Sequence, residues 1–253
     1  MSTLDGTTAL VTGASSGIGE ATALSLAASG AAVAVVARRK DRLEALARRI
    51  EAEGGRALVI EADVTDEAAA RACVEQTVQE LGRLDVLVNN AGVMLLGPME
   101  HAPVEEWQRM VELNVLGLMY CTHAALPHLL RAAEDSERRC ADIVNISSVA
   151  GRVARAGSGV YNATKFGVGA FSDSLRQEVT QRHVRVSLVE PGAVSTELAG
   201  HNRPEVLETI AKRFEGMERL ASEDIADAIT YVVTRPRHVA VNEVLIRPTE
   251  QQQ

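Results

Sequence analysis

The sequence has 253 residues, of which 46% are hydrophobic and 24% are charged, and its formal net charge is −8. This length allows a sizeable hydrophobic core, and the acidic balance argues against a nucleic-acid partner. No apolar run is long enough to cross a bilayer, and the N-terminal residues lack the basic and apolar regions of a secretory signal, so we expect a cytoplasmic protein with no membrane partner.

The chain alternates between short, β-prone apolar runs and segments of helical periodicity. The apolar runs predict strands at Thr7–Thr12, Ala31–Ala37, Arg56–Ala62, Leu84–Val88, Ala141–Ser147, Val184–Glu190 and Glu243–Ile246. The periodic segments predict helices at Gly17–Ser29, Lys40–Glu53, Asp66–Leu81, Pro103–Leu113, Gly117–Arg131, Asn162–Arg182 and, with Ser222 as its cap, Ser222–Thr234. This alternation predicts the α/β class: a doubly wound parallel sheet with helices on both faces, in a single domain over residues 1–253.

Three segments depart from this alternation. Arg131–Arg139 is highly charged and is expected to be a solvated helix end and loop. Thr196–Leu220 has no strand pattern and follows the end of a predicted strand, which is typical of a lid over a site. The last three glutamines, 251–253, are expected to fray.

The cysteines and histidines do not show the spacing of a metal site. Cys73, Cys121 and Cys140 are widely separated, so reduced thiols are expected. His123 and His128 are five residues apart, which fits neither a metal-binding helix face nor a zinc finger. We therefore expect no metal ion.

A glycine-rich turn joins the first predicted strand to the first predicted helix. Glycines let the backbone pass close to a pyrophosphate, and the helix N-terminus offers free N–H groups. A tight structural turn is the alternative. The residues expected to contact a cofactor here are Gly13, Ser15, Ser16, Gly17, Ile18 and Gly19.

The second predicted strand ends at Arg38 and Arg39. An acid here would hold the ribose 2′-hydroxyl of NAD, whereas an arginine suits the 2′-phosphate of NADP. Hydrogen bonds to charged groups contribute ~1.5–3 kcal/mol, which predicts roughly a 10- to 100-fold preference for NADP(H). Ordinary solvated charge is the alternative. Asp63 and Val64, after the third strand, are expected near the adenine, although Asp63 could equally start a helix.

Tyr161 and Lys165 are four residues apart near the start of a predicted helix, so they share one face. A free phenol has a pKa of about 10. A cation ~4 Å away, at an effective dielectric of ~20, favours the phenolate by ~4 kcal/mol, or roughly three pKa units before other effects oppose it. The pair therefore predicts a general acid or base, although the same spacing is common on solvated helices.

Taken together and in this order, six features resemble the short-chain dehydrogenase/reductase family. They are Gly13–Gly19, Asn89–Gly92, Asn114, the run Ile146-Ser147-Ser148, the Tyr161/Lys165 pair, and Pro191-Gly192. The resemblance covers nearly the whole chain. It implies a Rossmann fold, an NADP(H) cofactor, and a small-molecule carbonyl or alcohol as substrate.

The resemblance also implies a role for each matching catalytic residue. Tyr161 would donate the proton to a carbonyl oxygen, and Lys165 would lower its pKa and bind the nicotinamide ribose. Ser148, thirteen residues before the tyrosine, is preferred over Ser147 as the partner of the substrate oxygen. Asn114 would anchor a water in a proton relay to Lys165.

Further positions would hold the cofactor. Asn90, with the small residues Ala91 and Gly92, would approach it near the ribose. The segment from Pro191 through Gly192 and Val194 to Thr196 would hold the carboxamide, with the Thr196 hydroxyl contributing. Each of these residues has a local capping or turn role as its alternative.

The resemblance implies a homotetramer, in which Gly117–Arg131 and Asn162–Arg182 form one interface and the last strand another. The substrate stays open. A carboxylate on it could meet Arg152 or His201, although a solvated Arg152 fits equally well. One alternative is a 3-hydroxy acid or ketoacyl substrate, for which Arg152 and Arg155 would be docking candidates. The other is a regulator that senses NADP without turnover.

Overall fold

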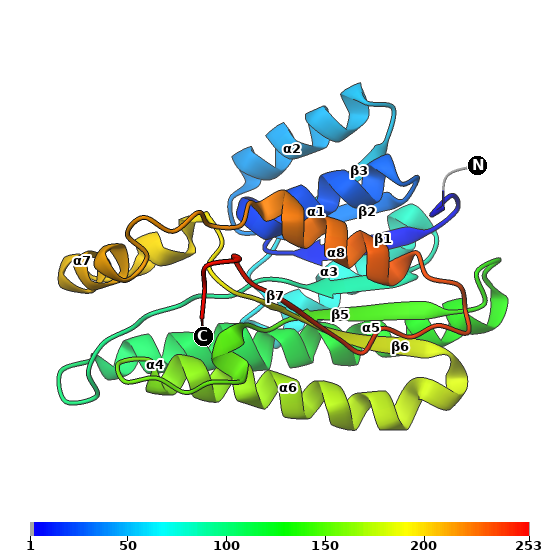
Figure 1. Cartoon of the computed structure of the whole chain (residues 1–253). Helices are drawn as coiled ribbons and strands as arrows, with labels where there is room; N and C mark the ends of the chain where they lie inside the picture. Colours follow the sequence, from blue (N-terminus) through cyan, green and yellow to red (C-terminus); the bar gives the residue numbers. More distant parts are fainter. Residues whose placement is uncertain (1–2, 253) are drawn as a thin grey trace.

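A parallel sheet of seven strands, in the order β3-β2-β1-β4-β5-β6-β7, forms the centre of the computed structural model, which describes residues 3–252 (Figure 1). The strands are β1 Thr8–Thr12, β2 Ala32–Ala37, β3 Arg56–Glu61, β4 Val86–Asn89, β5 Ala141–Ile146, β6 Val184–Pro191 and β7 Glu243–Ile246. The α-helices are α1 Gly17–Ala28, α2 Lys40–Ala52, α3 Glu67–Leu81, α4 Val104–Val111, α5 Leu118–Asp135, α6 Gly159–Val179, α7 Pro204–Arg213 and α8 Ser222–Val233. The short helical turns are η1 Glu112–Gly117, η2 Val149–Gly151, η3 Thr180–Arg182 and η4 Glu197–His201. The predicted doubly wound α/β sheet is confirmed.

The sheet is buried on both faces, which explains why its strands read as apolar runs. In β1, Ala9 and Val11 pack with α1, α2 and α8, whereas Leu10 packs with α3, α5 and α6 on the other face (Figure 1). Successive side chains of a strand point to opposite faces, so a strand between two helical layers needs apolar residues at every position.

The strand order reverses beside β1, which pairs with β2 on one side and with β4 on the other. In open α/β sheets, ligands bind outside the carboxyl ends of the strands at such a switch point. The segment after β6 extends beyond these ends, and α7 lies within it (Figure 1). The topology therefore places the glycine-rich turn, the end of β4 and the 196–220 segment around one space.

The two helices predicted at Pro103–Leu113 and Gly117–Arg131 form one continuous helical path. A π-helical turn, η1, joins α4 to α5, and the predicted break between them is absent from the described chain. A π turn inserts one extra residue into the helical repeat and is frequent at functional sites. Here Asn114 lies within the turn and is buried.

The charged stretch Arg131–Arg139 is more structured than the sequence predicts. α5 continues through Asp135, and the Arg138 side chain is only 15% exposed. Its Nη2 lies 2.7 Å from Oδ2 of Asp142, a fully buried carboxylate that also accepts hydrogen bonds from Arg185. A buried carboxylate needs such partners, so Arg138 is held at the protein surface layer, whereas Glu137 and Arg139 on either side of it are exposed as expected.

Two further expectations are corrected. Ser222 is the first residue of α8 and not its cap; the carboxylate of Asp224 accepts a hydrogen bond from the backbone N–H of Ala221 instead. Gln251 is 8% exposed, and its Oε1 accepts the N–H of Ala193 at 2.8 Å, so it is docked and not frayed. Gln253 lies outside the described residues. No helix within residues 3–252 is long and apolar enough to span a membrane.

Candidate active site

A cavity of about 410 Å³ lies at the carboxyl ends of the central strands. Nearly all of the residues expected at the site line it. They are Gly13, Ser15, Ser16, Gly17, Ile18, Arg38, Arg39, Asp63, Val64, Asn90, Ala91, Gly92, Ser148, Tyr161, Lys165, Pro191, Gly192, Val194 and Thr196. Gly19 and Asn114 do not line it; Gly19 packs against Gly13, and Asn114 hydrogen-bonds to the backbone of Val93, and both Gly13 and Val93 line the cavity.

The glycine-rich turn is fixed by close packing. Gly17 adopts a φ of +58°, a left-handed conformation that favours glycine. A Cβ on Gly19 would lie 2.4 Å from the carbonyl oxygen of Gly13, so only glycine lets α1 approach the turn. The Asn90 amide donates to the carbonyl oxygens of Thr12 and Gly13, at 3.0 and 3.3 Å. Asn90 thereby joins the end of β4 to the turn after β1.

The two arginines after β2 have different surroundings. Arg39 donates to the hydroxyls of Ser15 and Ser16, with its Nη2 at 2.9 and 2.7 Å from the two oxygens. Arg38 instead lies 3.6 Å from the carboxylate of Asp63. The structure therefore places Arg39, more than Arg38, directly beside the glycine-rich turn.

Asp63 does not begin the next helix. α3 is capped by Asp66, whose Oδ1 accepts the N–H of Ala69 at 2.7 Å. Asp63 Oδ1 accepts from the backbone N–H and the hydroxyl of Thr65, at 3.1 and 2.8 Å. Partial burial raises the pKa of Asp63, but these hydrogen bonds and the Arg38 charge outweigh burial and lower it. The carboxylate is therefore ionised at the cavity wall.

Tyr161 is 6% exposed, on the first turn of α6. Burial raises its pKa to about 12, and the hydrogen bond with Ser148 opposes this rise. The net shift of this pKa is upward, opposite to the shift expected from a nearby Lys165 charge alone. The Lys165 ammonium lies 5.8 Å from the ring centroid, and desolvation of the phenolate dominates. Tyr161 is therefore protonated at neutral pH.

Lys165 is 7% exposed and donates from Nζ to the carbonyl oxygen of Ile146 at 2.8 Å. Burial lowers its pKa to about 8. The side chain is still charged at pH 7, but it is held in surroundings that disfavour the charge. A nearby anion or hydroxyl would therefore gain more from this ammonium than from a solvated lysine.

Asn114 braces the backbone beside these groups. Its Oδ1 accepts the N–H of Val93 at 2.8 Å, and its Nδ2 donates to the carbonyl oxygen of Val93 at 2.9 Å and to the Thr164 hydroxyl at 3.2 Å. A Cβ on Gly92 would lie 3.3 Å from Asn114 Oδ1 and 3.9 Å from Lys165 Nζ. The amide and the ammonium thus flank one glycine.

The two neighbouring serines face different partners. Ser147 is buried, and its hydroxyl donates to the carbonyl oxygen of Lys165 at 3.2 Å. The Ser148 hydroxyl accepts the N–H of Ala150 at 3.1 Å, donates to the carbonyl oxygen of Pro191 at 3.4 Å, and opposes the rise in the Tyr161 pKa. This geometry favours Ser148 as the hydroxyl that faces a reacting oxygen.

The segment after β6 is held from two sides. A Cβ on Gly192 would lie 2.4 Å from Gln251 Oε1, so a side chain here would displace the docked Gln251. A Cβ on Gly17 would lie 3.1 Å from the Thr196 methyl group, which places Thr196 against the glycine-rich turn. The Thr196 hydroxyl accepts the N–H of Leu198 at 3.3 Å and caps η4.

Two cavity residues carry no sequence signal. Arg213 and Arg219 line the cavity, and each lies 5.4 Å from the Phe214 ring centroid on the 196–220 segment. They could be found only from the fold, because this segment has no strand pattern or motif. Arg155, a docking candidate from the sequence, also lines the cavity. His201 also lines the cavity, and burial, followed by the charges of neighbouring arginines, lowers its pKa.

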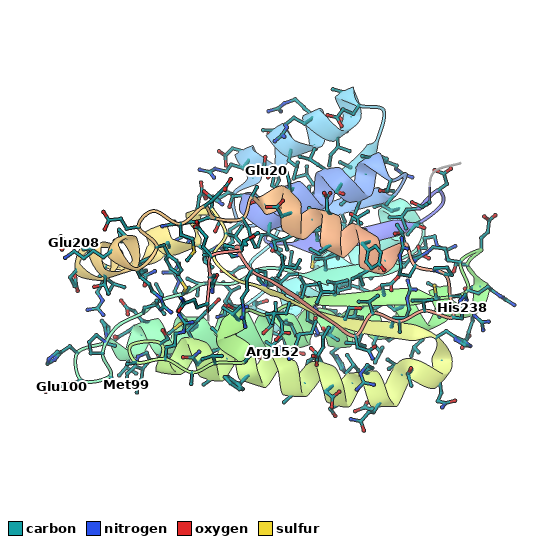
Figure 2. All side chains as sticks on the ribbon, in the orientation of Figure 1. Glu20, Met99, Glu100, Arg152, Glu208 and His238 are labelled. Carbon is teal, nitrogen blue, oxygen red and sulfur yellow. The ribbon has the colours of Figure 1, made fainter. Side chains whose placement is uncertain are left out.

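Arg152, labelled in Figure 2, is not a cavity residue. Its guanidinium pairs with the buried carboxylate of Glu190, with Nε 2.7 Å from Oε2, and it also pairs with Glu243. The Arg152 side chain is therefore ion-paired while 40% of it stays exposed to solvent, and it lies outside the cavity wall. Among residues 3–252, no group of three or more His, Cys, Asp or Glu side chains could hold a metal ion.

A model of the short chain dehydrogenase family matches residues 7–207. The chain belongs to the short-chain dehydrogenase family. It is 36% identical to an uncharacterized oxidoreductase of Staphylococcus saprophyticus, over 96% of each chain. It is 40% identical to a glycine betaine reductase of Emericella nidulans, but it spans only 19% of that protein's length.

Among solved structures, this short-chain dehydrogenase is similar to the closed form of a serine dehydrogenase complexed with NADP⁺. The two share 33% sequence identity and a TM-score of 0.88, over 97% of this chain and 96% of the other. The fold and the family are therefore established together, and the chain is an oxidoreductase of this family.

The depressed pKa of Lys165 predicts a stability gain when its charge is removed. Lys165→Met should raise the free energy of unfolding by about 1–3 kcal/mol at pH 7, since the wild-type protein keeps a desolvated cation. The unfolded lysine titrates near 10.5 and the folded one near 8. The gain should therefore be complete below pH 8, shrink between pH 8 and 10.5, and vanish above that range.

Urea unfolding across this pH range is the measurement. Lys212→Met, at an exposed position of α7, is the matched control and should change stability by less than about 0.5 kcal/mol. A Lys165→Met protein less stable than wild type at pH 7 would mean that the ammonium is held by favourable interactions that outweigh its desolvation.

Proposed function

We propose that this protein is an NADP(H)-dependent oxidoreductase that transfers hydride between the nicotinamide and a small carbonyl or alcohol. One observation carries the proposal. A buried, protonated phenol, its serine partner and a buried ammonium line the same cavity as a glycine-rich turn and two arginines. The NADP⁺-bound relative of the same fold supports the choice of cofactor.

Each end of the cavity would hold one part of the cofactor. Gly13, Gly17 and the N-terminus of α1 would take the pyrophosphate, and Arg38 and Arg39 the 2′-phosphate. Asp63 and Val64 would lie at the adenine. The Asn90–Gly92 wall, Lys165 and the 191–196 segment would hold the nicotinamide half. Bound NADPH would supply the hydride.

The protein's own residues would supply orientation and the proton. Tyr161, protonated because its pKa is about 12, would donate its phenolic proton to the carbonyl oxygen as negative charge develops there. Ser148 would donate a second hydrogen bond to the same oxygen. Lys165 would stabilise the phenolate left behind, and Asn114 would position the wall next to Lys165 and anchor a relay water. A protonated tyrosine is the form that can donate the proton in carbonyl reduction.

The candidate substrate is a polar aldehyde that carries negative charge. Five segments, Met94–Pro98, Gly117–Tyr120, Ala124–Leu130, Ala150–Val153 and Glu243–Thr249, are similar to clavulanic acid dehydrogenase, which reduces clavulanate-9-aldehyde with NADPH. In the cavity, Arg155, Arg213, Arg219 and His201 offer cationic or polar partners for a carboxylate. A 3-hydroxy acid or ketoacyl compound is the second candidate, favoured by the same arginines.

The substrate is tested by following NADPH oxidation against a panel of aldehydes and ketones that includes clavulanate-9-aldehyde, each beside a neutral analogue. Fast turnover of an anionic aldehyde would support the candidate. Turnover of neutral compounds alone would contradict it and leave the reaction class standing.

Residues 1–253 are proposed to act as one Rossmann-type domain, with the 196–220 segment as its lid, because Leu198, His201 and Ile210 of that segment line the cavity. A stable proteolytic fragment that lacks β7 and the tail but keeps full activity would contradict this.

A cytoplasmic location fits the three buried cysteines, none of which forms a disulfide, and cell fractionation would check it.

Tyr161→Phe removes the proton donor and keeps the ring that fills the buried position. We expect kcat for carbonyl reduction to fall by about 10²- to 10⁴-fold, with unchanged thermal stability to within about 1 kcal/mol. Tyr231→Phe, at an exposed position of α8, is the control and should keep full turnover. A Tyr161→Phe protein with normal biological activity would instead favour the regulator that senses NADP without turnover.

Arg39→Gln removes N–H donors from the expected 2′-phosphate site. The ratio of kcat/KM for NADPH to that for NADH should fall by about 10- to 100-fold. Arg48→Gln, exposed on α2, should leave the ratio unchanged.

Arg38→Asp, like Arg39→Gln, should shift the cofactor preference toward NADH. If neither variant at 38 or 39 moves the ratio, the 2′-phosphate does not bind at these arginines.

A homotetramer is proposed because large apolar side chains are exposed where the two expected interfaces lie. Phe166 on α6 is 44% exposed and Leu245 on β7 is 42% exposed. Phe166→Glu and Leu245→Glu should each convert the tetramer into dimers, since each places a charge in one interface. Light scattering after size exclusion measures the mass, and a monomeric wild-type protein would contradict the proposal.

A further inference from the structure

Glu197, the first residue of η4, connects the 196–220 segment to the loop after β2. Its Oε2 accepts a hydrogen bond from Arg39 Nη1 at 2.8 Å, and its Oε1 accepts one from Arg42 Nη1 at 2.6 Å. These two hydrogen bonds, from Arg42 first and Arg39 second, lower the pKa of Glu197 to about 2. The carboxylate is therefore a permanent anion seated between two guanidinium groups.

The same Arg39 guanidinium also donates to Ser15 and Ser16 of the glycine-rich turn. Arg39 and Glu197 both line the cavity. The Glu197 carboxylate thus lies where an anion bound by the arginines after β2 would lie. A guanidinium binds carboxylate and phosphate through the same fork of N–H groups, so one occupant excludes the other from those donors.

The other side of this segment has separate anchors. The Asn202 amide accepts the N–H of Leu96 at 2.7 Å and donates to the carbonyl oxygen of Met94 at 2.9 Å. Arg203 lies 3.1 Å from the carboxylate of Glu106. Loss of the Glu197 contacts would therefore free only the β2 side of the segment, while Asn202 keeps it attached to the loop after β4.

We propose that Glu197 competes with the 2′-phosphate of the cofactor for Arg39, and that this exchange couples cofactor binding to release of the 196–201 end of the lid. The proposal rests on the proposed binding of NADP(H) at the arginines after β2. It makes Glu197 a residue that sets cofactor affinity. Coupling between two sites is reciprocal. Bound phosphate should weaken the Glu197 ion pairs, and removing the Glu197 carboxylate should raise the affinity for phosphate by the same factor.

Calorimetry with two nucleotides tests the competition. Adenosine 2′,5′-bisphosphate carries the 2′-phosphate, and adenosine 5′-monophosphate lacks it. Glu197→Gln should bind the bisphosphate about 3- to 10-fold more tightly than wild type, as expected from the loss of two exposed ion pairs and of the repulsion between carboxylate and phosphate. Its affinity for the monophosphate should stay unchanged.

Glu208→Gln is the matched control, since Glu208 is exposed on α7 of the same segment (Figure 2) and makes no ion pair within the described residues. It should bind both nucleotides as wild type does. Unchanged or weaker bisphosphate binding by Glu197→Gln would overturn the competition. A wild-type protein that does not prefer the bisphosphate would overturn the proposed cofactor as well, so the two failures are distinguishable.

Hydrogen exchange followed by mass spectrometry gives a second readout without turnover. In wild type, the bisphosphate should speed amide exchange in residues 196–201 relative to the monophosphate. In Glu197→Gln, these amides should exchange rapidly with either nucleotide. Slower exchange in wild type on adding the bisphosphate would contradict release of this end of the lid.

Discussion

Burial of a phenol and an ammonium side by side, at the carboxyl end of a parallel sheet, is the constraint around which this site is organised. Desolvation moves the pKa of Tyr161 up and that of Lys165 down, so at neutral pH each keeps its proton. In water the pair would be an ordinary tyrosine and lysine. Inside the cavity, the Tyr161 phenol keeps the proton that it would donate, and the Lys165 ammonium can stabilise the phenolate after transfer.

Such a pair is costly to hold in place, and the surrounding structure supplies the support. The Lys165 ammonium is tied to the Ile146 carbonyl at the end of β5, and its backbone carbonyl accepts from Ser147. The π turn between α4 and α5 turns Asn114 toward the backbone of Val93, which forms the wall next to Lys165. These contacts join separate strands and helices at one edge of the sheet, so the site and the fold stabilise each other.

Much of this could be predicted from the sequence, for physical reasons. Strands between two helical layers must be apolar throughout, and a tight approach to a helix N-terminus requires glycine. The sheet and the turn at 13–19 followed from these patterns, helical spacing paired Tyr161 with Lys165, and the family resemblance implied that Ser148 joins them. The sign of the Tyr161 pKa shift did not, because spacing along a helix gives the nearness of a charge but not the degree of desolvation.

Other features depend on contacts between distant segments, which leave no local pattern. Glu197 meets Arg39 across 158 positions of the chain. The sequence predicts that Gln251 frays, but its side chain packs against Gly192 and accepts the N–H of Ala193. The sequence gives Arg152 no partner, but its guanidinium pairs with the buried carboxylate of Glu190. In each case, a polar residue is fixed by a partner that only the tertiary structure brings near.

The most direct test of hydride transfer in this cavity uses NADPH deuterated at C4 of the nicotinamide, in separate samples for its two faces. We expect reduction of an aldehyde to place one deuterium on the former carbonyl carbon of the product from one sample, and none from the other. The carboxyl-end cavity would then be a site of direct, face-selective transfer to the substrate. A product without deuterium from either sample would contradict this chemistry, whatever the affinity of the protein for NADPH.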